Sequence, residues 1–311
     1  MTSDKGPRHL AAEPISVVCH PSSDTMSFFL LDRFSTVAPR YDVVLCDIWG
    51  VVHNGIAAYA PACDALMRYR ASGGTVVLIT NAPRPSPWVV HQLGRLGVPA
   101  DAYDDVMTSG DLTREVVAGR KGRAVFHIGP QRDISIFDGL DVRLTPVEAA
   151  DYVVCSGLFD DTQETPDDYR DLMATIRGRG LFMVCANPDL VVERGDARVY
   201  CAGAIADLYA AMGGEVLYAG KPHRPIYDAA LAKAADARGA GAAPGRTLAI
   251  GDSLRTDMTG AQALGIDGLF VFGGIHAQEL GQGKSLPREA LSAMFAAAGV
   301  TPRSVMLRLA W

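Results

Sequence analysis

Short apolar runs rich in β-branched residues alternate with longer segments of helical periodicity along most of the chain. This alternation predicts a series of strands, most of them followed by a helix. The predicted strands are 42–46, 75–79, 123–128, 152–155, 181–185, 216–219, 247–250 and 268–272; the predicted helices are 62–72, 87–96, 167–177, 205–212, 224–237 and 255–264. The runs at 43–46 and 76–79 are apolar at every position, which is typical of strands covered by helices on both faces. We therefore predict an α/β fold with a parallel sheet.

The first 25 residues differ from the rest of the chain, because they are polar and rich in Pro and Ser. We expect 1–25 to form a flexible N-terminal tail. The chain has 311 residues, of which 49% are hydrophobic and 21% charged, a composition typical of a soluble globular protein with a substantial core. Its 29 basic and 35 acidic residues give a net charge of −6, which argues against nucleic acid as the main partner.

Cysteine spacing and hydropathy favour a cytoplasmic protein. The six cysteines are dispersed and form no CxxC pair or Cys/His cluster with zinc spacing, so we expect reduced thiols. No apolar run reaches the length of about 18 residues that a membrane helix needs, and the N-terminal segment lacks the basic head and apolar run of a signal peptide. We therefore expect no membrane partner.

Polar side chains suited to phosphate chemistry follow several of the predicted strands. They are Asp47 after 42–46, Thr80 and Asn81 after 75–79, Lys221 after 216–219, and Asp252 and Asp257 after 247–250. Because ligands collect at the carboxyl ends of strands in an open α/β sheet, we expect these side chains to meet. Taken singly, each has an ordinary interpretation as a helix cap, a turn residue or a solvated lysine. Together, a carboxylate nucleophile, a hydroxyl donor, a lysine and a pair of metal-binding acids are what phosphoryl transfer to an aspartate requires.

This ordered set resembles the haloacid dehalogenase (HAD) superfamily over most of the chain. The segment Ala186-Asn187-Pro188-Asp189 resembles the cap signature of subfamily IIA, which includes sugar-phosphate and nucleotide phosphatases. The resemblance implies a Rossmannoid, HAD-like parallel-sheet core at 26–129 and 216–311, with a large inserted α/β cap domain at 130–215.

The resemblance also implies a Mg²⁺ site and a covalent mechanism. Asp47 resembles the nucleophile that forms an aspartyl-phosphate and also binds the metal. Asp252 resembles the second metal carboxylate, and Asp257 resembles an acid that supports the metal through water. The backbone carbonyl of Trp49 would supply a further oxygen ligand, because that position requires no particular side chain.

The remaining implied roles concern the substrate. Thr80 and Asn81 would hold the phosphoryl group, and Lys221 would neutralise charge on the nucleophile and the transferring phosphate. Asp189 and Arg194, near the cap signature, have two interpretations: they select the leaving group of the substrate, or they serve only the structure of the cap.

One position departs from the family pattern. Phosphatases of this family carry Asp two residues after the nucleophile, whereas this chain has Trp49, which cannot transfer a proton. The missing acid/base contributes a factor of about 10² to 10⁴ in rate, so we expect slow turnover unless another group replaces it. His53, in the same loop, has a suitable titration range, although an ordinary loop histidine is the alternative.

We therefore predict a cytoplasmic, Mg²⁺-dependent hydrolase that acts on a small phosphorylated metabolite through Asp47. A binder of Mg²⁺ and a phosphorylated ligand without turnover is the alternative from a different class. Hydrolysis of a carbon–halogen bond is a third interpretation, because an aromatic residue at position 49 is similar to the metal-free dehalogenases of the superfamily. Asp252 and Asp257 argue against it, since both would be left without a cation. Family resemblance also allows a homodimer formed through the cap.

Overall fold

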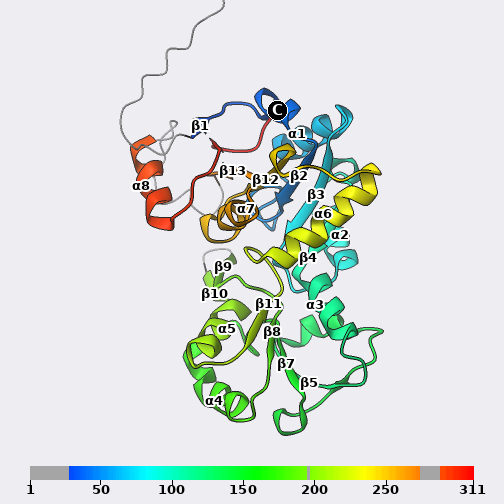
Figure 1. Cartoon of the computed structure of the whole chain (residues 1–311), viewed down its shortest axis with the longest axis vertical. Coiled ribbons are helices and arrows are strands. Elements are labelled where there is room, and N and C mark those ends of the chain that lie inside the picture. The colour runs from blue at the N-terminus through cyan, green and yellow to red at the C-terminus, as the bar shows by residue number, and fades with distance from the viewer. Residues whose placement is uncertain (1–27, 195–196, 274–287) are drawn as a thin grey trace, which may run out of the picture.

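The computed structural model describes residues 28–194, 197–273 and 288–311, which fold into two α/β lobes (Figure 1). The expected tail at 1–25 lies outside the described residues. The chain passes from the larger lobe to the smaller one between α3 (Ser109–Ala118) and β5 (Ala124–Ile128), and it returns between β11 (Val216–Tyr218) and α6 (Arg224–Arg238). The smaller lobe is therefore an insertion within the larger one.

The larger lobe is built on a seven-stranded sheet with the order β1-β14-β13-β12-β2-β3-β4, in which every neighbouring pair is parallel. Its strands are β1 (Phe29–Leu30), β2 (Val43–Asp47), β3 (Thr75–Thr80), β4 (Asp105–Thr108), β12 (Thr247–Gly251), β13 (Asp267–Val271) and β14 (Ser304–Met306). Besides α3 and α6, its helices are α1 (Ala60–Ala71), α2 (Ser86–Arg95), α7 (Thr259–Leu264) and α8 (Arg288–Ala298). This sheet confirms the predicted parallel α/β core.

Alternate residues of the central strands β2, β3 and β12 are buried on opposite faces of this sheet, as the geometry of a strand requires. One face packs against α1 and α2 and buries Val44, Cys46, Val76, Leu78, Leu248 and Ile250. The other face packs against α3 and α6 and buries Val43, Leu45, Val77, Ile79 and Ala249. Because both faces are covered, these strands contain almost no polar residue until their carboxyl ends, where the polar side chains gather.

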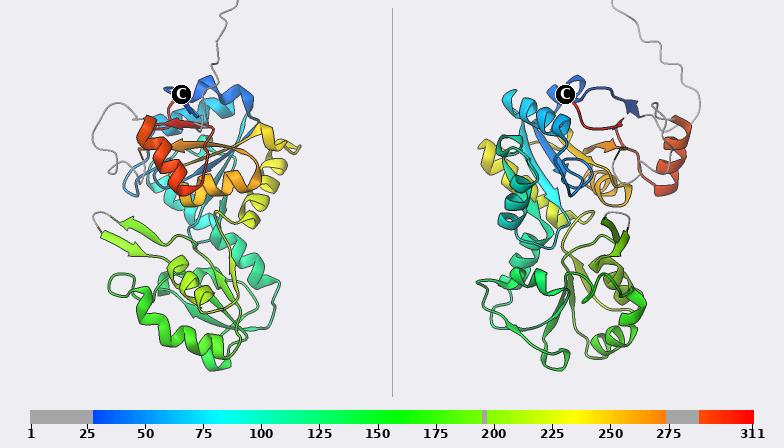
Figure 2. Two further views of the ribbon diagram at one scale, coloured as in Figure 1. Left: turned by 60° about the vertical axis from the view of Figure 1, so that its left-hand side comes forward. Right: turned by 180° about the vertical axis from the view of Figure 1, so that it is seen from behind.

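The smaller lobe has its own parallel sheet, with the order β11-β8-β7-β5-β6. Its further strands are β6 (Arg143–Leu144), β7 (Tyr152–Cys155) and β8 (Met183–Cys185), and its helices are α4 (Arg170–Gly178) and α5 (Ala202–Ala211). The antiparallel hairpin of β9 (Val191–Arg194) and β10 (Ala197–Tyr200) lies on the side of this lobe that faces the larger one (Figure 2). This lobe corresponds to the expected cap.

The sheet of the smaller lobe corrects the expected boundaries of 130 and 215. Strands β5 and β11 pair within this sheet, so the inserted lobe begins before residue 130 and continues past residue 215. The strand predicted at 216–219 therefore belongs to the sheet of the cap and not to the core sheet, and Lys221 follows it where the chain returns to the larger lobe. A βαβ pattern looks the same in both sheets, and only tertiary pairing decides which sheet a strand joins.

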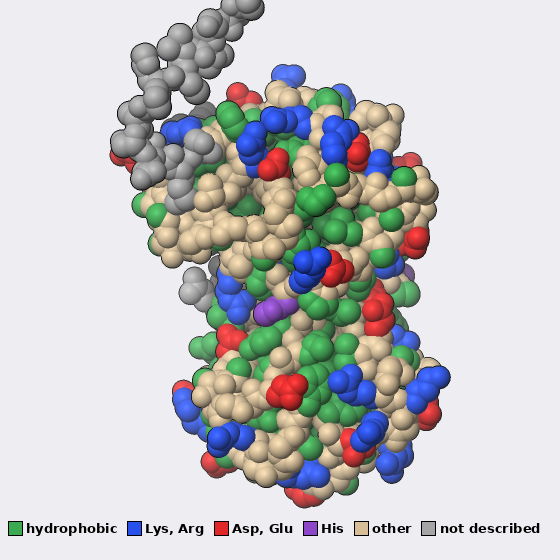
Figure 3. Space-filling view, viewed as in Figure 1, with side chains coloured by type: hydrophobic (Ala, Val, Ile, Leu, Met, Phe, Trp, Pro, Cys, Tyr) green, Lys and Arg blue, Asp and Glu red, His purple; other side chains and the backbone are tan. Residues whose placement is uncertain are grey.

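The structure bears on the surface charge, the cysteines and the membrane helices that the sequence analysis considered. Acidic and basic side chains are interspersed on the face drawn in Figure 3. The five cysteines in the described part of the chain are buried, and none of them forms a disulfide there. Among the described residues, no helix is both long enough and apolar enough to span a membrane.

Candidate active site

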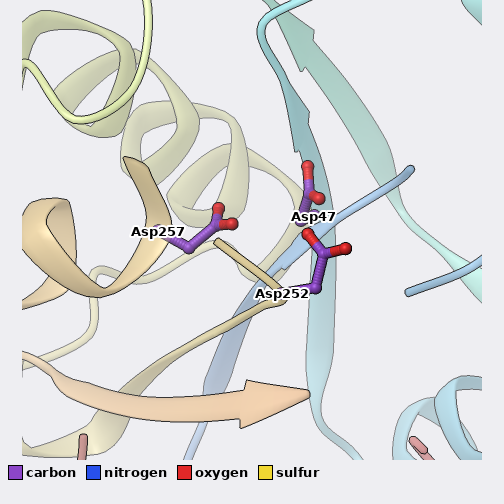
Figure 4. Close-up of side chains that lie close together, drawn as sticks. All are labelled: Asp47, Asp252 and Asp257. Carbon is purple, nitrogen blue, oxygen red and sulfur yellow. The ribbon is translucent and has the colours of Figure 1, made fainter. Parts of the chain in front are cut away.

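Three carboxylates meet at the carboxyl ends of β2 and β12, which are neighbours in the larger sheet (Figure 4). Asp47 is the last residue of β2, Asp252 follows β12, and Asp257 lies on the π-helical turn Leu254–Met258 that leads into α7. One oxygen of each carboxylate lies within 4.8 Å of the other two, and all three residues are buried. Three buried negative charges this close together require compensation by cations.

Lys221 supplies part of this compensation. Its Nζ donates hydrogen bonds to Oδ1 of Asp47 at 2.5 Å and to Oδ1 of Asp257 at 2.7 Å. Burial opposes the charged form of Lys221, but the two carboxylates outweigh it and raise the Lys221 pKa well above its usual value. Burial raises the pKa of Asp257 to about 6, and burial also raises the Asp47 pKa against the opposing effect of Lys221.

The charge and the space at the three carboxylates fit a divalent cation. Lys221 pairs with Asp47 and Asp257, and the three carboxylate oxygens that lie within 4.8 Å of one another form a compact oxygen donor set of the kind that holds a divalent cation. Two glycines make room for the side chains: a Cβ atom at Gly50 would lie 2.0 Å from Oδ2 of Asp252, and one at Gly251 would lie 2.1 Å from Cγ of Asp257. Carboxylate oxygens are the ligands that Mg²⁺ prefers in proteins, so the residues present suit this metal.

Asn81 joins the end of β3 to the cap and to the chain crossing at Lys221. Its Nδ2 donates to Oδ1 of Asp189 at 2.9 Å and to the carbonyl of Lys221 at 3.1 Å, and its Oδ1 accepts from the Lys221 N–H at 2.7 Å. Both N–H donors of the amide are therefore engaged within the protein. Asp189 is half-buried in this contact, and burial raises its pKa. The predicted phosphoryl-binding role of Asn81 stays a prediction.

The loop after Asp47 folds back on itself. The indole of Trp49 packs over Gly55, where a Cβ atom would lie 2.4 Å from the ring, and it meets the His53 ring edge-on at 5.3 Å between centroids. Nδ1 of His53 accepts a hydrogen bond from the N–H of Gly55 at 3.0 Å. The neutral ring therefore carries its proton on Nε2, and burial lowers the pKa of His53, which favours this neutral form.

A cavity of about 330 Å³ lies between the two lobes, and Ile48, the residue that follows Asp47, is part of its wall. The larger lobe contributes Trp49, His53, Thr80 and Arg84 to its wall, among other residues. The Thr80 hydroxyl accepts from the N–H of Ala82 at 3.2 Å, so its own proton remains available to a ligand. Trp49 is 40% exposed, which places a large aromatic surface where the family pattern has an acid.

The cap side of this cavity holds polar residues that the sequence analysis missed. Asp133 follows β5, and Ser156 follows β7 directly; Arg132 and Asp161 contribute a second pair of charges. The carboxyl ends of the two parallel sheets thus face the same cavity. The strand-end rule that identifies Asp47 and Asp252 applies equally to the strands of the cap, where it identifies Ser156 directly after β7.

The structure places the predicted site residues in three groups. One group is in mutual contact or close proximity: Asp47, Asn81, Asp189, Lys221, Asp252 and Asp257. A second group, consisting of Trp49, His53 and Thr80, lines the adjoining cavity. Arg194 ends strand β9, and the role predicted for its side chain lies outside what the structure describes.

Two family models match this chain, and together they cover most of the larger lobe and the beginning of the smaller one. Residues 44–143 match a family model described as haloacid dehalogenase-like hydrolase, and residues 218–296 match one described as HAD-hydrolase-like. A crystal structure of a hydrolase of the haloacid dehalogenase-like family from Brucella suis 1330 is 47% identical with a TM-score of 0.80, covering 90% of this chain and all of that one.

Two characterised relatives are more distant. The D-glycerol 3-phosphate phosphatase of Mycobacterium tuberculosis is 30% identical over 249 residues, covering 78% of this chain and 66% of the relative, just under two thirds. A crystal structure of the glycerol phosphate phosphatase of that organism in complex with magnesium has a TM-score of 0.60 and 27% identity, covering 77% of this chain and 70% of that one. The ribonucleotide monophosphatase NagD of Escherichia coli is 26% identical over 235 residues, covering 75% of this chain and 88% of the relative.

Proposed function

This chain belongs to the haloacid dehalogenase-like hydrolases, of the capped subfamily IIA type, and from that premise we propose that it is a Mg²⁺-dependent phosphatase of small phosphate monoesters such as sugar phosphates. The observation that carries the proposal is the buried contact of Lys221 Nζ with Asp47 Oδ1 at 2.5 Å, beside two further carboxylates. A nucleophilic carboxylate, a fixed ammonium and a metal-binding acid pair lie together at one sheet edge. Relatives named as phosphatases of glycerol phosphate and ribonucleotides support this substrate class.

In the first half-reaction, a carboxylate oxygen of Asp47 attacks the phosphorus atom and the ester oxygen departs, which leaves an aspartyl-phosphate on Asp47. Lys221 holds the nucleophile in place and offsets charge on the phosphoryl oxygens. The Thr80 hydroxyl donates to the phosphoryl group from the end of the neighbouring strand. Asp47, Asp252, the carbonyl of Trp49 and, through water, Asp257 would hold Mg²⁺, which would supply further positive charge to the phosphoryl group.

The site lacks an efficient group for proton transfer. Trp49 has no group that protonates a leaving oxygen or activates water. His53 is held neutral with its proton on Nε2, so it donates a hydrogen bond, but it accepts a proton only if the bond from Gly55 to Nδ1 breaks. Both proton transfers are therefore slowed, and hydrolysis of the aspartyl-phosphate depends on water activated without a nearby general base.

The test is phosphate release from a panel of phosphate monoesters with Mg²⁺, measured for the wild type, Asp47→Asn and His53→Ala. We expect slow release that Asp47→Asn abolishes and that EDTA prevents. A deep loss in His53→Ala would identify its Nε2–H as a required donor. No release above the Asp47→Asn background, with Mg²⁺-dependent binding of a phosphate analogue intact, would reject turnover and favour a phospho-ligand binder.

A further inference from the structure

A chain of hydrogen bonds fixes one carboxylate in the cap wall of the cavity. Nε2 of His127 lies 2.9 Å from Ser156 Oγ. Burial raises the pKa of Asp133, and hydrogen bonding by the Ser156 hydroxyl opposes this by lowering it. A carboxylate only accepts, so the Ser156 hydroxyl donates to Asp133 and accepts from the Nε2–H of His127. Burial lowers the pKa of His127 to about 4, which keeps its ring neutral and consistent with this direction.

The surrounding packing leaves this chain little freedom. The His127 ring meets the Phe137 ring edge-on at 5.3 Å between centroids. Gly129 closes the other side: a Cβ atom there would lie 2.1 Å from Ser156 Oγ and 2.8 Å from His127 Nε2. Asp133 itself is only 3% exposed, yet it lies on the cavity wall. The orientation of the Asp133 carboxylate is therefore set by the protein groups packed around it and not by solvent.

Arg84, from the larger lobe, faces Asp133 on the cap side of the same cavity. Its Nε lies 3.8 Å from Asp133 Oδ1, which is too long for a hydrogen bond, and its side chain is 40% exposed. The loop that carries Arg84 is fixed against α3, because Gly110 donates to the carbonyl of Ala82 at 3.1 Å and a Cβ atom at Gly110 would lie 2.4 Å from the Arg84 backbone. The Arg84 guanidinium and the Asp133 carboxylate thus lie on opposite sides of the cavity without a hydrogen bond between them.

The charges on this wall favour a neutral leaving group with hydroxyls over an anionic one. Arg84 and Arg132 are matched by Asp133 and Asp161, and Arg132 contacts Asp161 directly. A second anionic group on the substrate would therefore gain no net attraction here, whereas a hydroxyl finds an acceptor in Asp133 and a donor in Arg84.

We propose that Asp133 determines substrate specificity by accepting a hydrogen bond from a hydroxyl of the leaving group, and that Ser156 and His127 position its carboxylate. This inference rests on the proposed phosphatase function, and it identifies Asp133 as the residue that recognises the leaving group. Sites built to bond a substrate hydroxyl reject analogues that lack it, because the buried polar group is then left unpaired.

The experiment compares two esters of equal carbon number, glycerol 3-phosphate and n-propyl phosphate, with p-nitrophenyl phosphate as an activated ester. In the wild type we expect kcat/KM for glycerol 3-phosphate to exceed that for n-propyl phosphate by about 100-fold or more. Asp133→Ala should reduce this ratio by about 10- to 100-fold, mainly through KM for glycerol 3-phosphate. The p-nitrophenyl ester should be hydrolysed equally by both proteins.

The outcomes separate this inference from the proposed function. Turnover that depends on Asp47, with a ratio of the two esters near one in the wild type or unchanged in Asp133→Ala, would overturn the role of Asp133 and leave the phosphatase intact. Failure of all three esters, the activated one included, would overturn the phosphatase and this inference with it.

Two further variants guard against a folding defect. Ser156→Ala keeps the carboxylate and removes one positioning bond, so it should raise KM for glycerol 3-phosphate while kcat/KM for n-propyl phosphate stays unchanged. Asp138→Asn alters an exposed acid in the same segment, outside the cavity, and should leave both esters unaffected. Equal losses on both esters in Ser156→Ala would indicate a merely structural role and count against the proposal.

Discussion

Replacing Trp49 by Asp should speed turnover, because it restores a carboxylate where this family places its acid/base. General acid–base catalysis contributes a factor of about 10² to 10⁴, which corresponds to about 2.7 to 5.4 kcal/mol of activation free energy. The substitution also has a cost in stability. Trp49 is 40% exposed, so the rest of its surface is buried over Gly55 and His53. About 150 Å² of lost apolar burial at about 25 cal/mol per Å² gives an upper limit of about 4 kcal/mol.

Rapid mixing with p-nitrophenyl phosphate isolates the step that Trp49 affects. The p-nitrophenolate leaves without protonation, so formation of the aspartyl-phosphate does not need the missing acid. In the wild type, we expect a burst of p-nitrophenolate equal to the enzyme concentration, followed by a slow steady state limited by hydrolysis of the aspartyl-phosphate. In Trp49→Asp the burst should disappear and the steady-state rate should rise.

The matched control is Trp88→Asp, which replaces an exposed tryptophan on α2 outside the cavity and should leave both phases unchanged. Thermal melting of each variant shows whether Trp49→Asp remains folded at the assay temperature, since total stabilities are about 5 to 15 kcal/mol. A folded Trp49→Asp protein whose steady-state rate stays within about twofold of the wild type would refute the reasoning, since that factor is far below the expected gain.

Three more predictions concern the cluster of charges. Lys221→Met leaves Asp47 and Asp257 buried without their ammonium, so phosphate release should fall by about 100-fold or more and denaturant unfolding should show a loss of about 3 to 5 kcal/mol. Gly50→Ala forces a Cβ atom to within 2.0 Å of Asp252 Oδ2, so Mg²⁺ should no longer raise the melting temperature of this variant. In the wild type, Mg²⁺ at about 100 times its Kd should add about 2.7 kcal/mol of stability; EDTA should reverse this gain, and Asp252→Asn should weaken it in the same melting assay.

The positions of the acidic residues in the core were predictable because they depend on local sequence. Asp47 and Asp252 each follow an apolar run that is buried on both faces, so their position at a strand end is fixed by the strand itself. The structure brings Lys221 into contact with Asp47 and Asp257, as the strand-end pattern predicts, but the strand before it was assigned to the wrong sheet. Strand β11 pairs with β8 of the cap, and no property of residues 216–218 distinguishes that partner from a core strand.

The protonation of His53 and the placement of Asp133 on the cap wall of the cavity depend on tertiary structure. The titration range of histidine suggested an acid, whereas the hydrogen bond from Gly55 to Nδ1 depends on a turn that the sequence pattern did not indicate. Asp133 follows its strand by several residues, within the 3₁₀ helix Gln131–Phe137, so strand-end reasoning alone reaches Ser156 and not Asp133. Only the facing arrangement of the two sheets brings Asp133 opposite Arg84.

Asn81 links the position of the cap to the charge balance at Asp47. The chain crosses from cap to core just before Lys221, and the Asn81 amide bonds both the N–H and the carbonyl of that residue. The same amide holds Asp189 of the cap signature. A shift of the cap relative to β3 would therefore strain the bonds that fix the Lys221 backbone, and with it the ammonium that lies 2.5 Å from Asp47. The fully bonded state of the Asn81 amide thus favours a positioning role, in which the residue fixes the lysine, over direct contact with the phosphoryl group.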